Sequence, residues 1–218
     1  MRIRTPWIFA VGAGIYDLIT DQDTWREHCR KMAVLVPEET VLDLGIGPGV
    51  SGIEMARASP KMRLVGVDLS EQMIARAKRH VRKAGVDLPL VRCDALRLPF
   101  PDGSFGGATG HSFLYLTEDA DAILREVHRV LRPGGRVAFL EPNRDLGPFA
   151  RMRSVARAFR GGLRFGTSMF LWTIFSRLHG RYARTALVAQ LERCGFTDAG
   201  AEVTLSGLGL LATAQKPA

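Results

Sequence analysis

The sequence lacks the long apolar segment that a membrane-spanning helix requires. Its longest run without a charged residue, 103–117, has 15 residues, whereas a spanning helix usually needs about 18 or more. Cysteine is scarce as well: Cys29, Cys93 and Cys194 are odd in number and too far apart for a paired metal-ligand motif. We therefore expect no transmembrane helix, no disulfide scaffold and no metal site. A reducing, cytoplasmic compartment fits this cysteine content.

Strong compositional bias is also absent. Hydrophobic residues make up 46% of the 218 residues and charged residues 24%, ordinary values for a globular protein that argue against disorder and fibrous repeats. Glycine is abundant, with 23 residues, but it follows no period. A chain of this length favours a single domain.

Acidic residues are missing from one long segment. Between Asp145 and Glu192 there is none, although eight arginines lie there. The rest of the chain carries 22 basic and 22 acidic residues, so this segment accounts for the whole net charge of +8. Such a segment attracts phosphate on nucleic acid, anionic lipid or an acidic small molecule. The arginines are Arg151, Arg153, Arg157, Arg160, Arg164, Arg177, Arg181 and Arg184.

The first residues are basic and then apolar. Arg2 and Arg4 precede the apolar run Trp7–Ile15, an order that secretory signals share. Bulky Ile15 and Tyr16 follow the small residues of that run. We therefore favour an amphipathic or interfacial helix over a cleaved signal.

Short apolar strands alternate with amphipathic helices through the middle of the chain. The expected helices are 7–36, 50–59, 70–85 and 117–131, and the expected strands are 40–44, 62–68, 88–93, 105–110 and 136–140. Ser70 is suited to begin its helix and Gly85 to end it, while Pro133 stops the helix before it. This alternation implies crossover connections and a mainly parallel sheet. After Pro142 it breaks down, and a helix at 183–194 and a hairpin of strands 199–204 and 208–214 close the chain.

A glycine loop follows the first expected strand and has two interpretations. Gly47, Gly49 and Gly52 match the dinucleotide fingerprint, and Asp68 lies 19 residues beyond Gly49, where an acid would bind a ribose. Alternatively, the motif starts at Asp43, two residues before Gly45. An acid at that position is unfavourable beside a pyrophosphate but suits a ligand with an ammonium and a sulfonium group. The second interpretation is the stronger one.

Five ordered stretches then carry a resemblance to a known family. The chain resembles the class I S-adenosylmethionine-dependent methyltransferases, and within them the branch with ubiquinone/menaquinone C-methyltransferases and many small-molecule enzymes. The resemblance implies a Rossmann-like α/β fold: a seven-stranded, mainly parallel sheet with an antiparallel C-terminal hairpin, helices on both faces and a helical insertion after the fifth strand. The stretches are Val41–Gly49, Val65–Ser70, Arg92–Ala95, Leu98–Phe105 and Val130–Arg136.

The resemblance also divides the single domain into four parts. They are an N-terminal helical cap (1–37), a cofactor-binding core (38–142), a helical insertion that covers the acceptor (143–181), and a C-terminal helix with the hairpin (182–218).

S-Adenosylmethionine is the cofactor that the resemblance implies. Asp43 would lie near its ammonium and Asp68 would accept both ribose hydroxyls. Met73 is equally explained as a core residue, Ala95 as a loop residue, and Tyr16, which would close over the cofactor, as plain packing. The full expected set is Tyr16, Asp43, Gly45, Gly47, Gly49, Asp68, Leu69, Met73, Asp94, Ala95 and Gly110.

Catalytic candidates follow the fourth strand, in the loop that lies beside the transferring methyl group in this family. His111 acts as a base or orients the acceptor, or it is a structural histidine. Tyr115 is a second candidate, and Glu141 a third. The loop has no Asn/Asp-Pro-Pro-Tyr/Phe motif, which disfavours methylation of amino groups on bases or glutamine.

The predicted insertion indicates what kind of acceptor the enzyme methylates. Residues 148–160 predict a helix whose Phe149, Met152, Ala156 and Phe159 form an apolar stripe, and an aromatic run follows at 169–175. Three interpretations remain open: the stripe packs on the core, it lies in a membrane interface, or the arginines bind nucleic acid, which the aromatic clustering disfavours. In the membrane interpretation, the contacts with anionic lipid are Arg151, Arg153, Arg157 and Arg160.

The sequence therefore predicts a cytoplasmic enzyme that methylates a lipophilic small molecule or a lipid, such as a quinone-like ring or a phospholipid headgroup, at the membrane surface. The alternatives are a methyltransferase for a soluble metabolite or natural product, an RNA methyltransferase, and a cofactor-binding protein without turnover.

Overall fold

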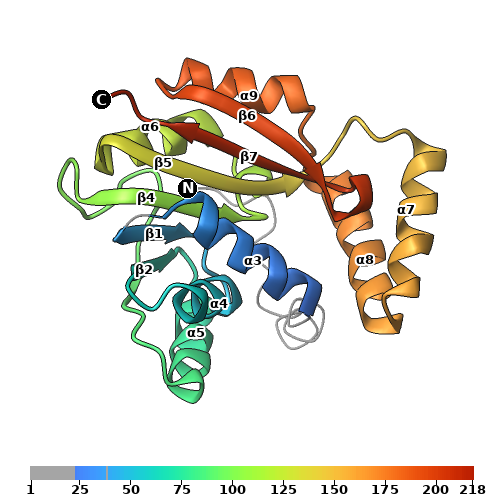
Figure 1. The fold of residues 1–218 in the computed structure, drawn as a ribbon, viewed down its shortest axis with the longest axis horizontal. Helices are drawn as coiled ribbons and strands as arrows, with labels where there is room; N and C mark the ends of the chain where they lie inside the picture. Colours follow the sequence, from blue (N-terminus) through green and yellow to red (C-terminus); the bar gives the residue numbers. More distant parts are fainter. Residues whose placement is uncertain (1–22, 38) are drawn as a thin grey trace.

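A seven-stranded sheet organises the chain (Figure 1). The computed structural model describes residues 23–37 and 39–218. The strand order is β3-β2-β1-β4-β5-β7-β6, and β7 runs antiparallel to β5 and β6 while the pairs among β1 to β5 are parallel. The Rossmann-like fold with an antiparallel hairpin, predicted from the sequence, is confirmed. Its strands are β1 (Thr40–Leu44), β2 (Arg63–Asp68), β3 (Leu90–Arg92), β4 (Phe105–His111), β5 (Leu131–Pro142), β6 (Thr197–Thr204) and β7 (Gly209–Gln215).

Helices cover both faces of this sheet. Figure 1 shows α3, α4 and α5 on one side and α6 and α9 on the other, while α7 and α8 project beyond the carboxyl end of β5. The helices are α3 (Asp23–Leu35), α4 (Val50–Ala58), α5 (Glu71–Ala84), α6 (Ala120–Val130), α7 (Pro148–Arg160), α8 (Leu163–His179) and α9 (Arg184–Arg193).

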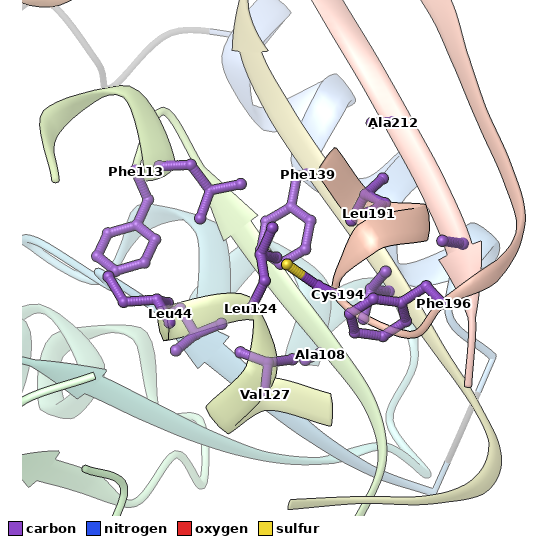
Figure 2. Close-up of a cluster of buried hydrophobic side chains, with 14 of the residues drawn as sticks. Leu44, Ala108, Phe113, Leu124, Val127, Phe139, Leu191, Cys194, Phe196 and Ala212 are labelled. Carbon is purple, nitrogen blue, oxygen red and sulfur yellow. The ribbon is translucent and has the colours of Figure 1, made fainter. Parts of the chain in front are cut away.

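Two apolar clusters separate the sheet from its helices. The central strands are buried on both faces, so successive residues serve opposite clusters: Val41 faces α3 and α4, whereas Leu42 and Leu44 face α6. Figure 2 shows the second cluster, in which Phe139 of β5 packs with Leu124 of α6. Both clusters are required to hold the strand ends, and therefore the loops beyond them, in fixed positions.

Capping residues end the helices largely where the sequence predicts. The Ser70 hydroxyl accepts the backbone N–H of Met73 at 3.3 Å, and Gly85 takes a left-handed conformation (φ 66°) after α5. At α6 the prediction needs correction, because Asp119 is the N-cap and the helix is shorter than 117–131. Strand β5 then begins at Leu131, five residues before the predicted start, since Leu131 pairs with Phe105 ahead of a bulge.

The predicted helix at 148–160 is present as α7, but its inward face differs from the prediction. Phe149, Met152 and Phe159 are exposed. The interpretation in which this stripe packs on the core is therefore wrong. The buried face of α7 instead includes Ser154, whose hydroxyl donates to the Ser206 carbonyl at 2.6 Å, and Ala158.

Arg151 also departs from the prediction. Its side chain is buried, and its Nη2 atom donates to the carbonyl oxygens of Asn143 (2.9 Å) and Leu146 (2.8 Å). The guanidinium has five donors in a rigid fork, so it can hydrogen-bond to several backbone carbonyls of one turn. Arg151 therefore fixes the chain leaving β5 and is not a lipid contact, whereas Arg153, Arg157 and Arg160 are exposed.

No helix in the described part of the chain combines the length and apolarity needed to cross a membrane.

Candidate cofactor and acceptor site

The glycine loop connects the carboxyl end of β1 to the first turn of α4. Gly45, Gly47 and Gly49 have φ angles of 62°, 53° and 94°, a left-handed region that other residues rarely adopt. A Cβ atom on Gly45 would lie 2.3 Å from the Phe113 ring. The loop thus depends on glycine both for its turn and for its close approach to the neighbouring loop after β4.

Asp43 lies beneath this loop and is fully buried. Its Oδ2 atom accepts the Ser51 hydroxyl at 2.6 Å and its Oδ1 atom accepts the Thr109 hydroxyl at 2.8 Å. Burial raises the pKa of Asp43 to about 6, against the opposing effect of these two hydrogen bonds. The carboxylate ties β1 to α4 and β4, and it brings negative charge under the glycine loop.

Asp68 ends β2 beside the same loop. Its Oδ2 atom accepts the backbone N–H of Gly47 at 3.0 Å, and its Oδ1 atom accepts that of Ser70 at 2.8 Å. Burial is the main reason that the pKa of Asp68 is raised. The side chain therefore joins the glycine loop to the start of α5.

Three more residues expected around the cofactor, Leu69, Asp94 and Ala95, follow adjacent strands, and Met73 lies in the first turn of α5. Asp68 pairs in register with Arg92 of β3, so Leu69 and Asp94 follow neighbouring strands. Asp94 accepts the backbone N–H of Leu96 at 2.9 Å. Met73 and Ala95 are buried, and Ala95 belongs to the core cluster on the side of α6.

The loop after β4 is held from below by one carboxylate. Glu141, on β5, is fully buried, and it accepts the backbone N–H groups of Phe113 (3.1 Å), Leu114 (2.8 Å) and Tyr115 (3.2 Å). Burial raises the pKa of Glu141 to about 7, even though all three hydrogen bonds act in the opposite direction. A group surrounded in this way positions the loop and does not reach a substrate.

His111 stands at the start of that loop, and Trp25 of α3 covers it. The two ring centroids are 4.7 Å apart with an interplanar angle of 65°. The Nε2 atom of His111 is buried without a hydrogen-bond partner among the described residues. Burial, with a smaller contribution from the nearby His28, lowers the pKa of His111 to about 4. The imidazole is therefore neutral at physiological pH.

A small cavity of about 40 Å³ is lined by the glycine loop, Trp25 and His111, whereas Asp43, Asp68 and Glu141 are not in its lining. It lies between the glycine loop, α3 and the end of β4. Tyr115 does not line it: the Tyr115 ring is buried and lies edge-on to Phe175 of α8, with centroids 6.4 Å apart. Gly110 is also absent from its lining; a Cβ there would come within 2.8 Å of the Phe139 ring. The lining residues are Trp25, Cys29, Gly45, Ile46, Gly47, Pro48, Val50, Ser51 and His111.

Comparison with known proteins identifies the family to which this chain belongs. Residues 41–135 match the model of a methyltransferase domain. The demethylmenaquinone methyltransferase of Thermus thermophilus is 31% identical over 178 residues, which span 79% of this chain and 81% of that protein. The chain belongs to the class I S-adenosylmethionine-dependent methyltransferases.

Two further comparisons with this methyltransferase are informative. The ubiquinone/menaquinone biosynthesis C-methyltransferase of Desulfotalea psychrophila is 36% identical over 157 residues, 65% of this chain and 63% of that protein. Among solved structures, an S-adenosylmethionine-dependent methyltransferase from Aquifex aeolicus superposes with a TM-score of 0.63 at 20% identity, covering 91% of each chain. This last similarity concerns the fold alone.

The carboxylates beside the glycine loop fit S-adenosylmethionine, the cofactor of this methyltransferase. Each Asp68 oxygen accepts one backbone N–H and keeps acceptor capacity for a further hydrogen bond. Two ribose hydroxyls require that capacity. The buried negative charge of Asp43 would repel a phosphate group, but S-adenosylmethionine has no phosphate.

The sequence predicted some residues of the methyltransferase site that the structure does not describe, and it did not indicate others that the structure places there. Tyr16 lies outside the described residues. Trp25 escaped the sequence analysis, although Trp25, Cys29 and Met32 recur at helical spacing and are all buried. Trp172, whose ring lies 5.5 Å from Trp25 at 89°, was visible only as part of an apolar run. Nothing in sequence spacing connects α3 with either the loop after β4 or α8.

Proposed function

We propose that this methyltransferase methylates a ring carbon of a lipophilic aromatic acceptor, a hydroquinone with an apolar tail. The observation that carries this proposal is the chain of ring contacts His111–Trp25–Trp172, in which one indole covers a neutral imidazole and packs edge-on against a second indole. Such flat apolar surfaces suit a planar ring with few polar atoms. The names of the two quinone-pathway relatives support the same acceptor class.

Asp68 is proposed to bind the two ribose hydroxyls and Asp43 to attract the ammonium group through Ser51 and the loop. Leu69, Asp94 and Ala95, which follow β2 and β3, and Met73, in the first turn of α5, are proposed to surround the adenine. The glycine loop, with Gly45, Gly47 and Gly49, lets the cofactor approach the backbone. Gly110 and Tyr16 complete the proposed set.

When bound, S-adenosylmethionine supplies a methyl group on a positively charged sulfur, which a nucleophile attacks in line. His111 is the proposed base. Its Nε2 atom accepts the proton of the acceptor hydroxyl, and the electrons of the broken O–H bond increase the nucleophilicity of the ring carbon. After the methyl group has been transferred, the ring carbon loses its hydrogen as a proton to solvent, which restores the aromatic ring, and His111 returns its proton to the acceptor oxygen. The low pKa keeps this nitrogen free of a proton before the reaction.

Trp25 and Trp172 have a supporting role in this scheme. The Trp25 ring excludes water from one side of His111, and Trp172 packs against Trp25 and supports it. Tyr115 is retained as a second candidate only through its position in the same loop, because its ring contacts Phe175 and not the cavity.

A lipophilic acceptor also suggests where the enzyme works. An apolar-tailed hydroquinone partitions into membranes, so we propose that the protein acts at the inner surface of a membrane from the cytoplasm. All three cysteines are unpaired thiols, which agrees with a reducing compartment.

The test is methyl transfer from labelled S-adenosylmethionine by the purified protein. Acceptors are a prenylated naphthohydroquinone in detergent micelles, the same ring without its tail, phosphatidylethanolamine and RNA. We expect label on a ring carbon of the prenylated compound, identified by mass spectrometry and NMR, and a higher KM for the tail-less ring.

Two results would contradict the proposal. Label on phosphatidylethanolamine or RNA alone would assign another acceptor class. No transfer to any hydroquinone by a protein that binds S-adenosylmethionine in calorimetry would remove the quinone assignment while leaving the family intact. The matched control is Asp87→Asn, an exposed carboxylate away from the site, which should leave transfer unchanged.

A further inference from the structure

Helix α8 presents an apolar face to the outside of the molecule. Leu163, Phe170, Leu171, Ile174 and Leu178 are all exposed, Leu163 by 75% and Leu178 by 73%. They recur at intervals of seven, one, three and four residues, which places them on one side of a helix. A surface helix normally turns such a face toward the core, so its outward direction calls for an external apolar partner.

The opposite face of α8 is the one that packs inward. Met169 and Trp172 are buried and belong to the core cluster on the side of α3. Ser176 and His179 are also buried on this side. The helix therefore cannot rotate its apolar outer face inward without expelling Trp172 from its contact with Trp25.

Helix α7 extends the exposed apolar surface. Phe149 is 79% exposed and Met152 65%. The Phe159 ring lies over Gly166 of α8, where a Cβ atom would come within 2.2 Å. This contact places the stripe of α7 on the side that borders α8. Figure 1 shows the two helices as a pair that projects from the sheet.

The charge around this surface is of one sign. Arg153, Arg157 and Arg160 are exposed along α7, and neither helix contains an acidic residue. A second copy of this chain on a two-fold axis would bring like-charged arginines together at the interface. An anionic lipid surface instead offers phosphate groups to the arginines and an acyl boundary to the apolar side chains.

We propose that α7 and α8 form a docking surface for anionic membranes, with the apolar side chains of both helices at the acyl boundary and Arg153, Arg157 and Arg160 on lipid phosphates. This surface differs from the one expected from the sequence, since Arg151 is excluded and Met169 and Trp172 of the run 169–175 are buried, whereas Leu163 and Leu178 are added. It deepens the proposed function by naming the surface from which a lipophilic acceptor arrives. Docking itself requires neither cofactor nor acceptor.

The experiment is co-sedimentation of the full chain with vesicles, without S-adenosylmethionine or acceptor. Vesicles of phosphatidylcholine are compared with vesicles that also contain phosphatidylglycerol, at low and at high salt. We expect binding to the anionic vesicles that weakens with salt and little binding to pure phosphatidylcholine. Because no methyl transfer is measured, a failure of docking is distinguishable from a failure of the proposed acceptor.

Two sets of variants locate the surface. Phe170→Ser, Ile174→Ser and Leu178→Ser together should weaken binding by at least about tenfold, since each removes exposed apolar area. Arg153→Gln, Arg157→Gln and Arg160→Gln together should do the same at low salt, by about tenfold or more.

Matched controls separate the docking surface from general hydrophobicity and charge. Val34→Ser removes an exposed apolar side chain from α3. Lys78→Gln, Arg79→Gln and Arg82→Gln remove the same number of charges from the exposed side of α5. Both controls should bind vesicles like the unmodified protein, and all variants should keep its circular dichroism and melting temperature.

The proposal is overturned if the unmodified protein binds neither vesicle type, or if the α5 control loses as much binding as the α7 variant. It is equally overturned if sedimentation shows a dimer that the α8 variant dissociates while vesicle binding is absent. That last result would make the apolar face a self-association surface.

Discussion

The Trp25 indole covers the His111 imidazole at a centroid distance of 4.7 Å, which joins α3 to the end of β4 across 86 residues of sequence. This contact shields the imidazole from water and contributes to its low pKa of about 4. The Nε2 atom of this imidazole is buried and has no hydrogen-bond partner among the described residues.

The first prediction concerns the pH dependence of catalysis. An ordinary histidine protonates near pH 6.5, whereas His111 does so at about 4. The kcat should therefore stay constant as pH falls through 6.5 and decline only nearer 4. Trp25→Leu exposes the His111 ring to water, so the pKa of His111 should rise and the acidic limb of the kcat profile should move to higher pH. Steady-state kinetics and NMR titration of His111 measure the two shifts. An unmoved limb would assign the titration to another group.

His111→Gln tests the proposed base directly. The variant retains hydrogen-bonding capacity but accepts no proton, so kcat should fall by about a hundredfold or more while S-adenosylmethionine affinity changes little. Steady-state kinetics and calorimetry together check this. Equal losses in both quantities would make His111 a cofactor-binding or structural residue.

Asp68→Asn should weaken S-adenosylmethionine binding by about tenfold or more, because charge-assisted hydrogen bonds contribute roughly 1.5–3 kcal/mol each. Calorimetry measures the affinity, and thermal unfolding checks that the bonds to Gly47 and Ser70 survive. Asp87→Asn serves as the control. Unchanged affinity in a folded Asp68 variant contradicts the ribose assignment.

Gly45→Ala tests whether the glycine loop must meet Phe113 closely. A Cβ atom would lie 2.3 Å from that ring, so the variant should bind S-adenosylmethionine more weakly and unfold more easily. Gly85→Ala is a matched control, since Gly85 has a similar φ of 66° but no atom within 4 Å of the added Cβ. It should cost about 1–2 kcal/mol of stability and leave cofactor affinity intact. Similar affinities in the two variants would remove any role for the Phe113 contact.

Glu141 makes folding stability depend on pH in an unusual direction for a carboxylate. Its pKa is raised from an ordinary 4.5 to about 7 in the folded protein. The folded state therefore holds a proton that the unfolded state has released, and the resulting stability is complete below 4.5 and lost as pH rises through about 7. Glu141→Gln should flatten this part of the stability curve in urea unfolding. An unchanged slope would assign it to another group, Asp43 included.

Most of the fold is readable from the sequence because local signals agree with one another there. The β1 strand, the glycine loop and Ser70 each combine a suitable periodicity with a suitable terminal residue, and the structure has all three. The start of β5 was misplaced because Pro133 and the following glycines resemble a turn. Pairing with Phe105 across the sheet supplies the missing strand residues, and no local pattern encodes it.

The site was less predictable where it depends on contacts between distant segments. Arginine content showed that α7 is basic, but only the turn after β5 reveals why Arg151 points inward to the carbonyls of Asn143 and Leu146. Glu141 looked like a candidate base, whereas its three backbone partners make it a support for the loop. An apolar stripe likewise predicts a helix face without indicating whether that face meets core or solvent.

Adjacent residues of α8 point in opposite directions: Leu171 outward and Trp172 toward Trp25. With the proposed docking surface on the membrane, the width of one helix thus separates the lipid from the contact between Trp172 and Trp25. The acceptor would then be found by diffusion in two dimensions, and turnover would follow its mole fraction in the bilayer and not its bulk concentration. Diluting the vesicle lipid with an inert phospholipid, at constant total acceptor, should therefore slow the enzyme.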